Sequence, residues 1–300
     1  MTSHPKVFLN GERCQVWALH RDTGEPRYIE VGEADSLRPY AKKHLRCPYP
    51  GCDVEISTRG GSRRDHYFHP NTTPHETEPE SESHLAAKAM IAQWLAGVVP
   101  DGATVQVEQT VKDPNSALHR RPDVIATGRT GAQVAYEVEY KAWAVDDWRK
   151  KQEDLDAASI TTLWLIGHTR VRPAKAIGCA ANEVVLPELA AAIARAGKPV
   201  VLVNPVTREI GTLTDSTGAA WYDGSGHAWL HIDPLDECRF SARHGIRTPS
   251  MLPIEAAERQ QAEVEDQRQQ YRIAWAALWE PRHSAKPSLT DGVQSPRTSR

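Results

Sequence analysis

Hydrophobic and polar positions recur with helical or strand periodicity after residue 83, and this pattern predicts a series of regular elements. The expected elements are a helix over residues 83–95, strands over residues 104–111, 121–127 and 133–141, a helix over residues 146–158 and a strand over residues 162–166. Their order is αβββαβ. The pattern therefore indicates a mixed α/β (α+β) fold.

Shorter patterns on both sides of this core predict further elements. A β-hairpin is expected within residues 6–32, with strands at residues 7–9, 15–19 and 28–31. Residues 254–278 lack Gly and Pro and are expected to form one long, mostly polar helix. The other expected elements, whose strands would extend the core sheet, are a helix over residues 187–196, a hairpin of residues 199–204 and 209–214, and a strand over residues 228–232.

A polar, acidic, Pro-containing stretch at residues 70–83 is typical of a linker and divides the chain. The expected units are an N-terminal hairpin and Cys/His-rich module (1–75), the core (80–170), a C-terminal α/β extension (171–250), the long helix (251–280) and a disordered Ser/Pro/Arg-rich tail (281–300).

Composition narrows the class of protein. The chain has 300 residues, and 40% of them are hydrophobic, which is enough to bury a globular core. It has no run of about 18 apolar residues and no secretory-type start, so we expect a cytoplasmic protein without a membrane contact. A net charge of −3 argues against coating nucleic acid by bulk electrostatics. The five cysteines are too few and too widely spread for a disulfide framework.

Cysteine and histidine residues gather just after the predicted hairpin. Cys47 and Cys52 bracket a short loop, and His66 and His69 follow after a basic stretch. Two thiolates and two imidazoles suit a closed tetrahedral site for structural zinc. A segment with so few aliphatic residues also needs a metal to fold, which favours zinc.

The exact zinc ligands stay open at this level. His44 and His75 are nearby substitutes, and Cys14 could approach through the hairpin. The alternative is a chance grouping of reduced thiols and surface histidines.

The same segment carries a cationic surface beside the aromatic Tyr67 and Phe68. Its basic residues are Lys42, Lys43, Arg46, Arg59, Arg63 and Arg64. Such a surface suits phosphate contact and base stacking, although many basic runs are only solvated.

Two acidic residues face each other in the second predicted β-hairpin. A three-residue loop ending at Gly131 would pair Thr127 with Gln133, and therefore Asp123 with Glu137. Opposed side chains on one sheet face have Cβ atoms roughly 5 Å apart. Two carboxylates at that separation repel unless a proton or a hard divalent cation neutralises them, so we expect a metal site.

Glu139 and Lys141 continue the face that carries Glu137. An alternative interpretation needs no active site. In it the polar face meets solvent, and Glu139 forms an ordinary cross-strand ion pair with Arg121.

Several of these motifs together resemble a known family. Pro122-Asp123 followed by Glu137-x-Glu139, or by Glu139-x-Lys141, within an αβββαβ order resembles the restriction-endonuclease-like core of the PD-(D/E)xK nucleases. The Cys47, Cys52, His66 and His69 set, Ser81-Glu82-Ser83-His84-x-x-x-Lys88 and Arg121-Pro122-Asp123 make the chain similar to the competence protein CoiA family. The resemblance covers about residues 6–168.

This resemblance implies a metal-dependent nuclease that acts on DNA. It also implies a role with single-stranded DNA in transformation or recombination, with recombination proteins as partners. Asp123 and Glu137 would hold Mg²⁺ or Mn²⁺, and Glu82 could add a ligand. Glu139 stands where the family typically has Gln, so Lys141 would have to supply the cation of the motif.

Basic residues near these motifs are expected to contact nucleic acid. They are Arg63, Arg64, His84, Lys88 and Arg121. His84 and Lys88 lie one helical turn apart and could instead be a plain surface pair.

Two other functions remain open. One is a catalytically inactive, zinc-containing protein that binds nucleic acid, which the departure at Glu139 favours. The other is an adaptor that uses residues 254–278 for self-association or a partner.

Overall fold

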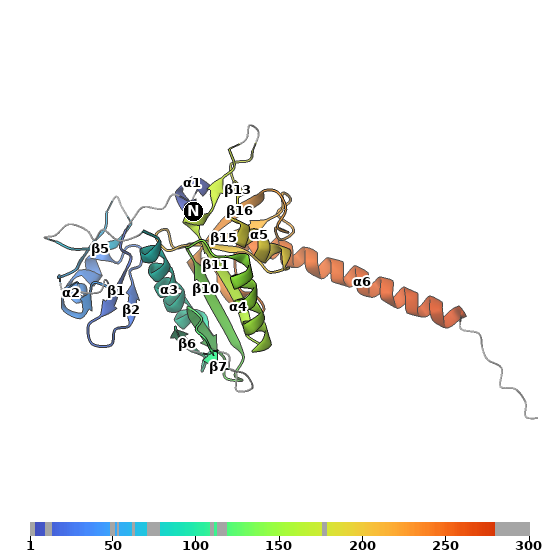
Figure 1. The fold of residues 1–300 in the computed structure, drawn as a ribbon, viewed down its shortest axis with the longest axis horizontal. Coiled ribbons are helices and arrows are strands. Elements are labelled where there is room, and N and C mark those ends of the chain that lie inside the picture. Colours follow the sequence, from blue (N-terminus) through green and yellow to red (C-terminus); the bar gives the residue numbers. More distant parts are fainter. Residues whose placement is uncertain are drawn as a thin grey trace, which may run out of the picture. The chain divides into compact units, whose positions relative to one another are not determined.

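The computed structural model describes residues 4–9, 14–48, 52, 54–61, 64–70, 79–108, 111–112, 119–175 and 179–279. The chain forms two compact units, residues 1–257 and residues 258–300. Figure 1 shows the elements in chain order, from the blue N-terminal helix α1 to the red α6. The expected tail at residues 281–300 and most of the expected linker, residues 71–78, lie outside the described residues.

The first element is a short helix, α1 (Pro5–Leu9), and the strand expected at residues 7–9 is wrong. The amides of Val7 and Phe8 both donate to the carbonyl of His4, which closes a helical turn. Phe8 and Leu9 are buried in the hydrophobic cluster of the large sheet. A short apolar run does not distinguish a strand from a buried helix, and tertiary packing decides here.

The expected N-terminal hairpin is confirmed in β1 (Trp17–His20) and β2 (Pro26–Tyr28), which pair antiparallel. The pattern missed helix α2 (Ala34–His44), which contains Pro39. The remaining strands of the module are β3 (Leu45–Arg46), β4 (Ser57–Arg59) and β5 (His66–Phe68). The sparse aliphatic content of this module suggested that it depends on a metal to fold. The structure shows that the module also has buried hydrophobic side chains of its own.

The αβββαβ order is confirmed. Its elements are α3 (Pro79–Val98), β6 (Thr104–Val107), β9 (Val124–Thr127), β10 (Gln133–Glu139), α4 (Val145–Ala157) and β11 (Thr161–Gly167). The chain then forms a separate two-stranded ladder of β7 (Val111–Lys112) and β8 (His119–Arg120), which lies after β6 and before β9 in the sequence.

The downstream strands extend the same sheet, as expected. They are β12 (Arg172–Pro173), β13 (Glu183–Val185), β14 (Val201–Asn204), β15 (Glu209–Thr214) and β16 (Ala228–Pro234). The nine-stranded sheet has the order β12-β13-β16-β15-β14-β11-β10-β9-β6. Within it β10, β11 and β14 run parallel to one another, while the strands on either side are antiparallel.

The remaining described elements are short strands and turns and two helices. They are α5 (Glu188–Arg195), the ladder of β17 (Arg239–Ser241) and β18 (Gly245–Arg247), the short 3₁₀ turns η1 (His168–Arg170), η2 (Leu235–Glu237) and η3 (Pro249–Met251), and α6 (Leu252–Trp279). The long helix was expected over residues 254–278. No helix in the described part of the chain is long and apolar enough to cross a membrane.

Helices cover both faces of the sheet around β10 (Figure 1). Tyr136 and Val138 pack in one cluster with Met90 of α3, whereas Ala135 packs on the other face with Leu155 of α4. Successive residues of a strand point to opposite faces, which explains this division. The strand is therefore buried on both sides.

The N-terminal module packs on α3 and is tied to the sheet by Arg64. The Arg64 guanidinium donates to the carbonyl of Ile29 at 2.6 Å, to the hydroxyl of Tyr28 at 3.0 Å and to the carbonyl of Val206 at 2.8 Å. Trp17 shares a hydrophobic cluster with α3 side chains. The module is thus joined to the core by both apolar packing and hydrogen bonds.

Candidate nuclease site

Asp123 and Glu137 lie at adjacent ends of β9 and β10. The observed register pairs Thr127 with Gln133 and Val124 with Tyr136, as the turn chemistry predicts. One residue further along, Asp123 Oδ2 accepts a hydrogen bond of 2.8 Å from the amide of Val138. This bond fixes the Asp123 carboxylate beside β10 where the two strands begin to diverge.

Glu137 is buried rather than solvated, which overturns the alternative of a solvent-facing polar strand. It is 2% exposed. Lys151 of α4 donates from Nζ to Glu137 Oε2 at 2.7 Å, whereas Oε1 is buried without a hydrogen-bond partner among the described residues. The pKa of Glu137 is raised to about 7, and burial is the main cause. Lys151 opposes this rise, whereas the negative charge of Asp123 adds to it.

Helix α3 brings two basic side chains to Asp123. His84 Nε2 lies 3.3 Å from Asp123 Oδ2, and Lys88 Nζ lies 3.5 Å from Asp123 Oδ1. Burial alone would raise the pKa of Asp123, but His84, the amide of Val138 and Lys88 together hold it below its usual value. Asp123 is therefore an anion at neutral pH, where Glu137 is only partly ionised.

Glu108 belongs to the same cluster, and the sequence pattern gave no sign of it. Its carboxylate accepts from Lys88 on one oxygen and from Arg121 on the other. The hydrogen bond from Lys88 is the main reason that the pKa of Glu108 is lowered. Glu108 has a φ of 53°, so the chain turns sharply there and directs the side chain toward α3.

The ion pair between Arg121 and Glu139, which belonged to the alternative interpretation without an active site, is wrong, because Arg121 pairs with Glu108 instead. Glu139 Oε1 accepts from the backbone amide of Lys141 at 2.7 Å, and burial raises the pKa of Glu139. The side chain of Lys141 is exposed beyond the end of β10. Lys141 thus shares a strand end with the carboxylates, but Lys151 is the lysine that bonds to Glu137.

Lys151 was missed by sequence reasoning, although a signal existed. It stands four residues before the buried Leu155, so both occupy the face of α4 that covers β10. A lysine on the buried face of a helix needs an acidic partner, and Glu137 lies beneath it.

Two further predicted residues cannot be placed. Arg63 lies outside the described residues, and so does the side chain of Glu82. Arg64 is described, but its donors are used to join the module to the core.

The part of the chain that carries these residues matches a known protein family. Residues 80–214 match the family model described as "Competence protein CoiA, nuclease-like domain". This part of the chain is therefore a nuclease-like domain of the CoiA type. The match confirms the resemblance noted in the sequence, and it runs from α3 through β15. The curated proteins include no match to the chain.

Three of the four predicted zinc ligands come together in the module that precedes the CoiA domain. The ligand atoms of Cys47, Cys52 and His69 all lie within 4.8 Å of one another, and Cys52 Sγ is 3.7 Å from His69 Nε2. His66 lies apart, because its Nδ1 contacts the carbonyl of Arg64 at 2.8 Å. The strand β5 ends at Phe68, which frees His69 to turn toward the cysteines.

The substitute ligands do not complete this group among the described residues. His44 stacks on Tyr40 with ring centroids 4.6 Å apart. Cys14 is buried in the hydrophobic cluster that links the module to α3. His75 lies outside the described residues.

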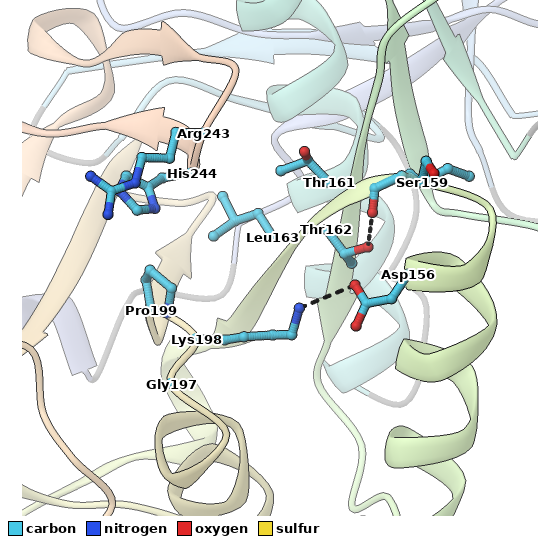
Figure 2. A pocket seen from close by; sticks show the side chains of 11 residues that line it. Asp156, Ser159, Thr161, Thr162, Leu163, Gly197, Lys198, Pro199, Arg243 and His244 are labelled. Atoms are coloured by element: carbon cyan, nitrogen blue, oxygen red, sulfur yellow. Dashed lines mark hydrogen bonds and ion pairs between the residues drawn. The ribbon is translucent and has the colours of Figure 1, made fainter. Parts of the chain in front are cut away.

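A separate pocket of about 430 Å³ opens where β11 begins, away from the carboxylates of the CoiA domain. Figure 2 shows Lys198 pointing toward Asp156, with their charged atoms 3.3 Å apart, while Arg243 and His244 line another wall. Residues Asp123 and Glu137 do not line it. The pocket is therefore distinct from the candidate nuclease site.

Proposed function

We propose that the chain is a metal-dependent nuclease that cleaves DNA, with Asp123 and Glu137 holding Mg²⁺ or Mn²⁺. The observation that carries the proposal is the buried carboxylate of Glu137, whose Oε1 has no hydrogen-bond partner among the described residues. It lies beside the anionic Asp123. A buried oxygen without a partner is costly unless a ligand satisfies it.

The chemistry of these donors fits a hard cation. Carboxylate oxygens are the preferred protein ligands of Mg²⁺, and one or two carboxylates are the usual number. When bound, the metal would lower the pKa of water and stabilise the charge that develops on the phosphate. We include Glu82, near the start of α3, in the proposal as an additional ligand.

The basic residues around the carboxylates have separate roles in this proposal. Lys151 compensates the buried Glu137 and stands in for the lysine of the PD-(D/E)xK motif. Lys88 is buried between Glu108 and Asp123 and holds these two carboxylates in place. Arg121, whose side chain is 62% exposed, can contact the DNA backbone from the rim. His84 orients the Asp123 carboxylate.

The N-terminal module is proposed to bind structural zinc through Cys47, Cys52 and His69. Two thiolates and an imidazole suit zinc rather than magnesium. The module also offers a DNA contact, because the Arg59 guanidinium lies over the ring of Phe68 at 4.2 Å. Single-stranded DNA in transformation or recombination, and recombination proteins as partners, are the biological setting that the CoiA family suggests.

A second candidate is an inactive nuclease fold that only binds DNA. Lys151 on Glu137 and Lys88 on Asp123 favour it, because cations already neutralise part of each carboxylate. The two candidates differ in whether the purified chain cuts.

A cleavage assay with Mg²⁺ or Mn²⁺ on single- and double-stranded DNA tests the proposal. We expect Asp123→Asn and Glu137→Gln each to lower the rate by more than about 100-fold, since each removes a metal ligand. Asp147→Asn is the matched control, because Asp147 is an exposed acid on α4. DNA binding measured in parallel should change little in any of them.

A folded wild-type chain that binds DNA but never cuts it would replace the nuclease with the binding protein. Lys151→Ala refines a positive result. If Lys151 acts in catalysis, its loss lowers the cleavage rate while leaving the DNA dissociation constant unchanged.

A further inference from the structure

Three residues that could bind a metal meet at the edge of the sheet, apart from both sites described above. The ligand atoms of Cys179, Glu183 and His227 all lie within 4.8 Å of one another. Glu183 is the first residue of β13, and His227 directly precedes β16. The two strands are neighbours in the sheet (Figure 1), which places their side chains together.

The backbone around these residues is fixed by hydrogen bonds. The β13–β16 ladder pairs Glu183 with Trp229, and the amide of Leu230 donates to the carbonyl of Asn182 at 2.9 Å. The amide of Glu183 donates to the carbonyl of Ala180 at 3.0 Å, which folds the chain back toward Cys179. The three side chains therefore start from an ordered frame rather than from a loose loop.

The Glu183 carboxylate is oriented within this frame. Its Oε2 accepts from the amide of Ala180 at 3.1 Å, and its Oε1 contacts Nδ1 of His227. The Glu183 side chain is only 11% exposed, whereas that of His227 is 41% exposed. A carboxylate held on one oxygen by the backbone keeps the other available for a metal.

We propose that Cys179, Glu183 and His227 bind a zinc-class divalent transition metal. A thiolate, an imidazole and a carboxylate together form the mixed ligand set that Zn²⁺ accepts and that Mg²⁺ and Ca²⁺ do not. Three protein ligands leave a fourth tetrahedral position for water or for a ligand from outside.

Small side-chain movements would complete this site. Ligand atoms around tetrahedral zinc lie roughly 3.5 Å apart, so each pair of the three atoms must approach by at most about 1.3 Å. In the absence of metal His227 and Glu183 form an ion pair, and binding replaces that pair with two bonds to the metal. The metal would then tie the end of β13 to the start of β16.

Alkylation of Cys179 tests the proposal directly on the full-length chain. The rate of its reaction with iodoacetamide, followed by peptide mass spectrometry, is compared with Zn²⁺, with Mg²⁺ and with EDTA. We expect Zn²⁺ to slow alkylation of Cys179 at least about tenfold and Mg²⁺ to have no effect, because a metal-bound thiolate is a poor nucleophile. Reading Cys179 alone separates this site from Cys47 and Cys52 of the module.

Two variants decide whether the protection is specific. His227→Gln removes one ligand and should abolish most of the protection. His231→Gln, within β16 and hydrogen-bonded to Thr214, should leave the protection intact. Co²⁺ adds a spectroscopic readout, since a thiolate-to-cobalt absorption band should be weaker in Cys179→Ser than in the wild type. Equal alkylation of Cys179 with Zn²⁺ and with EDTA, or full protection in His227→Gln, would overturn the proposal.

Discussion

The two proposed metal-binding carboxylates, Asp123 and Glu137, differ in their protonation at neutral pH. Neighbouring positive charge and hydrogen bonds keep the pKa of Asp123 low, whereas burial raises the pKa of Glu137 to about 7. In a nuclease that uses both carboxylates, a change of pH near neutrality would alter the protonation of Glu137 but not that of Asp123. The Glu137 carboxyl must lose a proton before it can bind a cation.

Metal binding should therefore weaken in mild acid. Below about pH 7 the cation competes with a proton on Glu137, so the Mn²⁺ affinity should fall about tenfold between about pH 8 and about pH 6. Isothermal titration calorimetry in buffers of different ionisation enthalpy measures both the affinity and the released proton. In Glu137→Gln the Mn²⁺ affinity should be low, and binding of Mn²⁺ should no longer release a proton. If this variant still releases the proton, the proton comes from another group.

His168 gives a second pH dependence, this time of stability. It is buried beside Tyr140 and Val203, and burial lowers its pKa to about 4, while a hydrogen bond to the Val203 carbonyl opposes the shift. The unfolded chain binds a proton near pH 6.5 but the folded chain does not, so stability falls as the pH drops from about 6.5 to about 4. At about pH 5 the loss should reach about 2 kcal/mol.

Urea unfolding at neutral and acidic pH measures this loss. His168→Asn keeps a side-chain N–H donor but has no proton to gain, so the part of the acid loss due to His168 should be absent. The exposed His4→Asn is the control and should behave as the wild type. An equally steep loss in His168→Asn would show that other groups carry the pH dependence.

The end of β11 packs closely against Tyr140 of the preceding segment. A Cβ atom added at Gly167 would lie 2.4 Å from Cδ1 of Tyr140, whose ring is fully buried and whose hydroxyl donates to the Val203 carbonyl. We expect Gly167→Ala to lower the free energy of unfolding by about 1–3 kcal/mol, because the ring cannot move aside without losing its hydrogen bond.

A second glycine in the same domain provides the matched control. Gly97 lies in α3, and no atom would come within 4 Å of an added Cβ. Gly97→Ala should raise the free energy of unfolding by about 1 kcal/mol through helix propensity. Urea midpoints of the two variants should move in opposite directions; a shift in the same direction would refute the packing argument at Gly167.

The elements themselves were largely predictable from the sequence, and the contacts between them were not. Periodicity and turn chemistry gave the β9–β10 register, since a three-residue turn leaves one way to pair Thr127 with Gln133. No local pattern reveals that Lys151 reaches Glu137 or that Glu108 joins Lys88, because these pairs depend on how α4 and α3 cover the sheet. Helix α2 was hidden by its internal Pro39, which argues against a helix when read alone.

At the scale of the whole molecule, the N-terminal segment belongs to the large sheet and not to the module that follows it in sequence. Phe8 is fully buried against the sheet, and its carbonyl accepts a hydrogen bond from the side chain of Asn204 at 2.6 Å. The module is thus inserted between a first helix and a core that pack together.

Phe8→Ala should therefore destabilise the CoiA domain itself, by about 3–5 kcal/mol, because it leaves a cavity beside Gly211 and His168. Thermal unfolding of the full chain measures the effect. Val7→Ala is the control, because Val7 is 54% exposed and should change stability by less than about 0.5 kcal/mol. Equal effects of the two would show that α1 does not support the sheet.

The position of α1 also sets an order of events during synthesis. Phe8 leaves the ribosome long before Asn204, since 196 residues separate them in the chain. The apolar side chains of α1 therefore stay exposed until β14, β15 and β16 have been synthesised. Contacts between residues so far apart in the chain also form slowly. In a nascent chain arrested before residue 200 we therefore expect Phe8 and Leu9 to stay exposed, and such apolar side chains favour aggregation until the sheet forms.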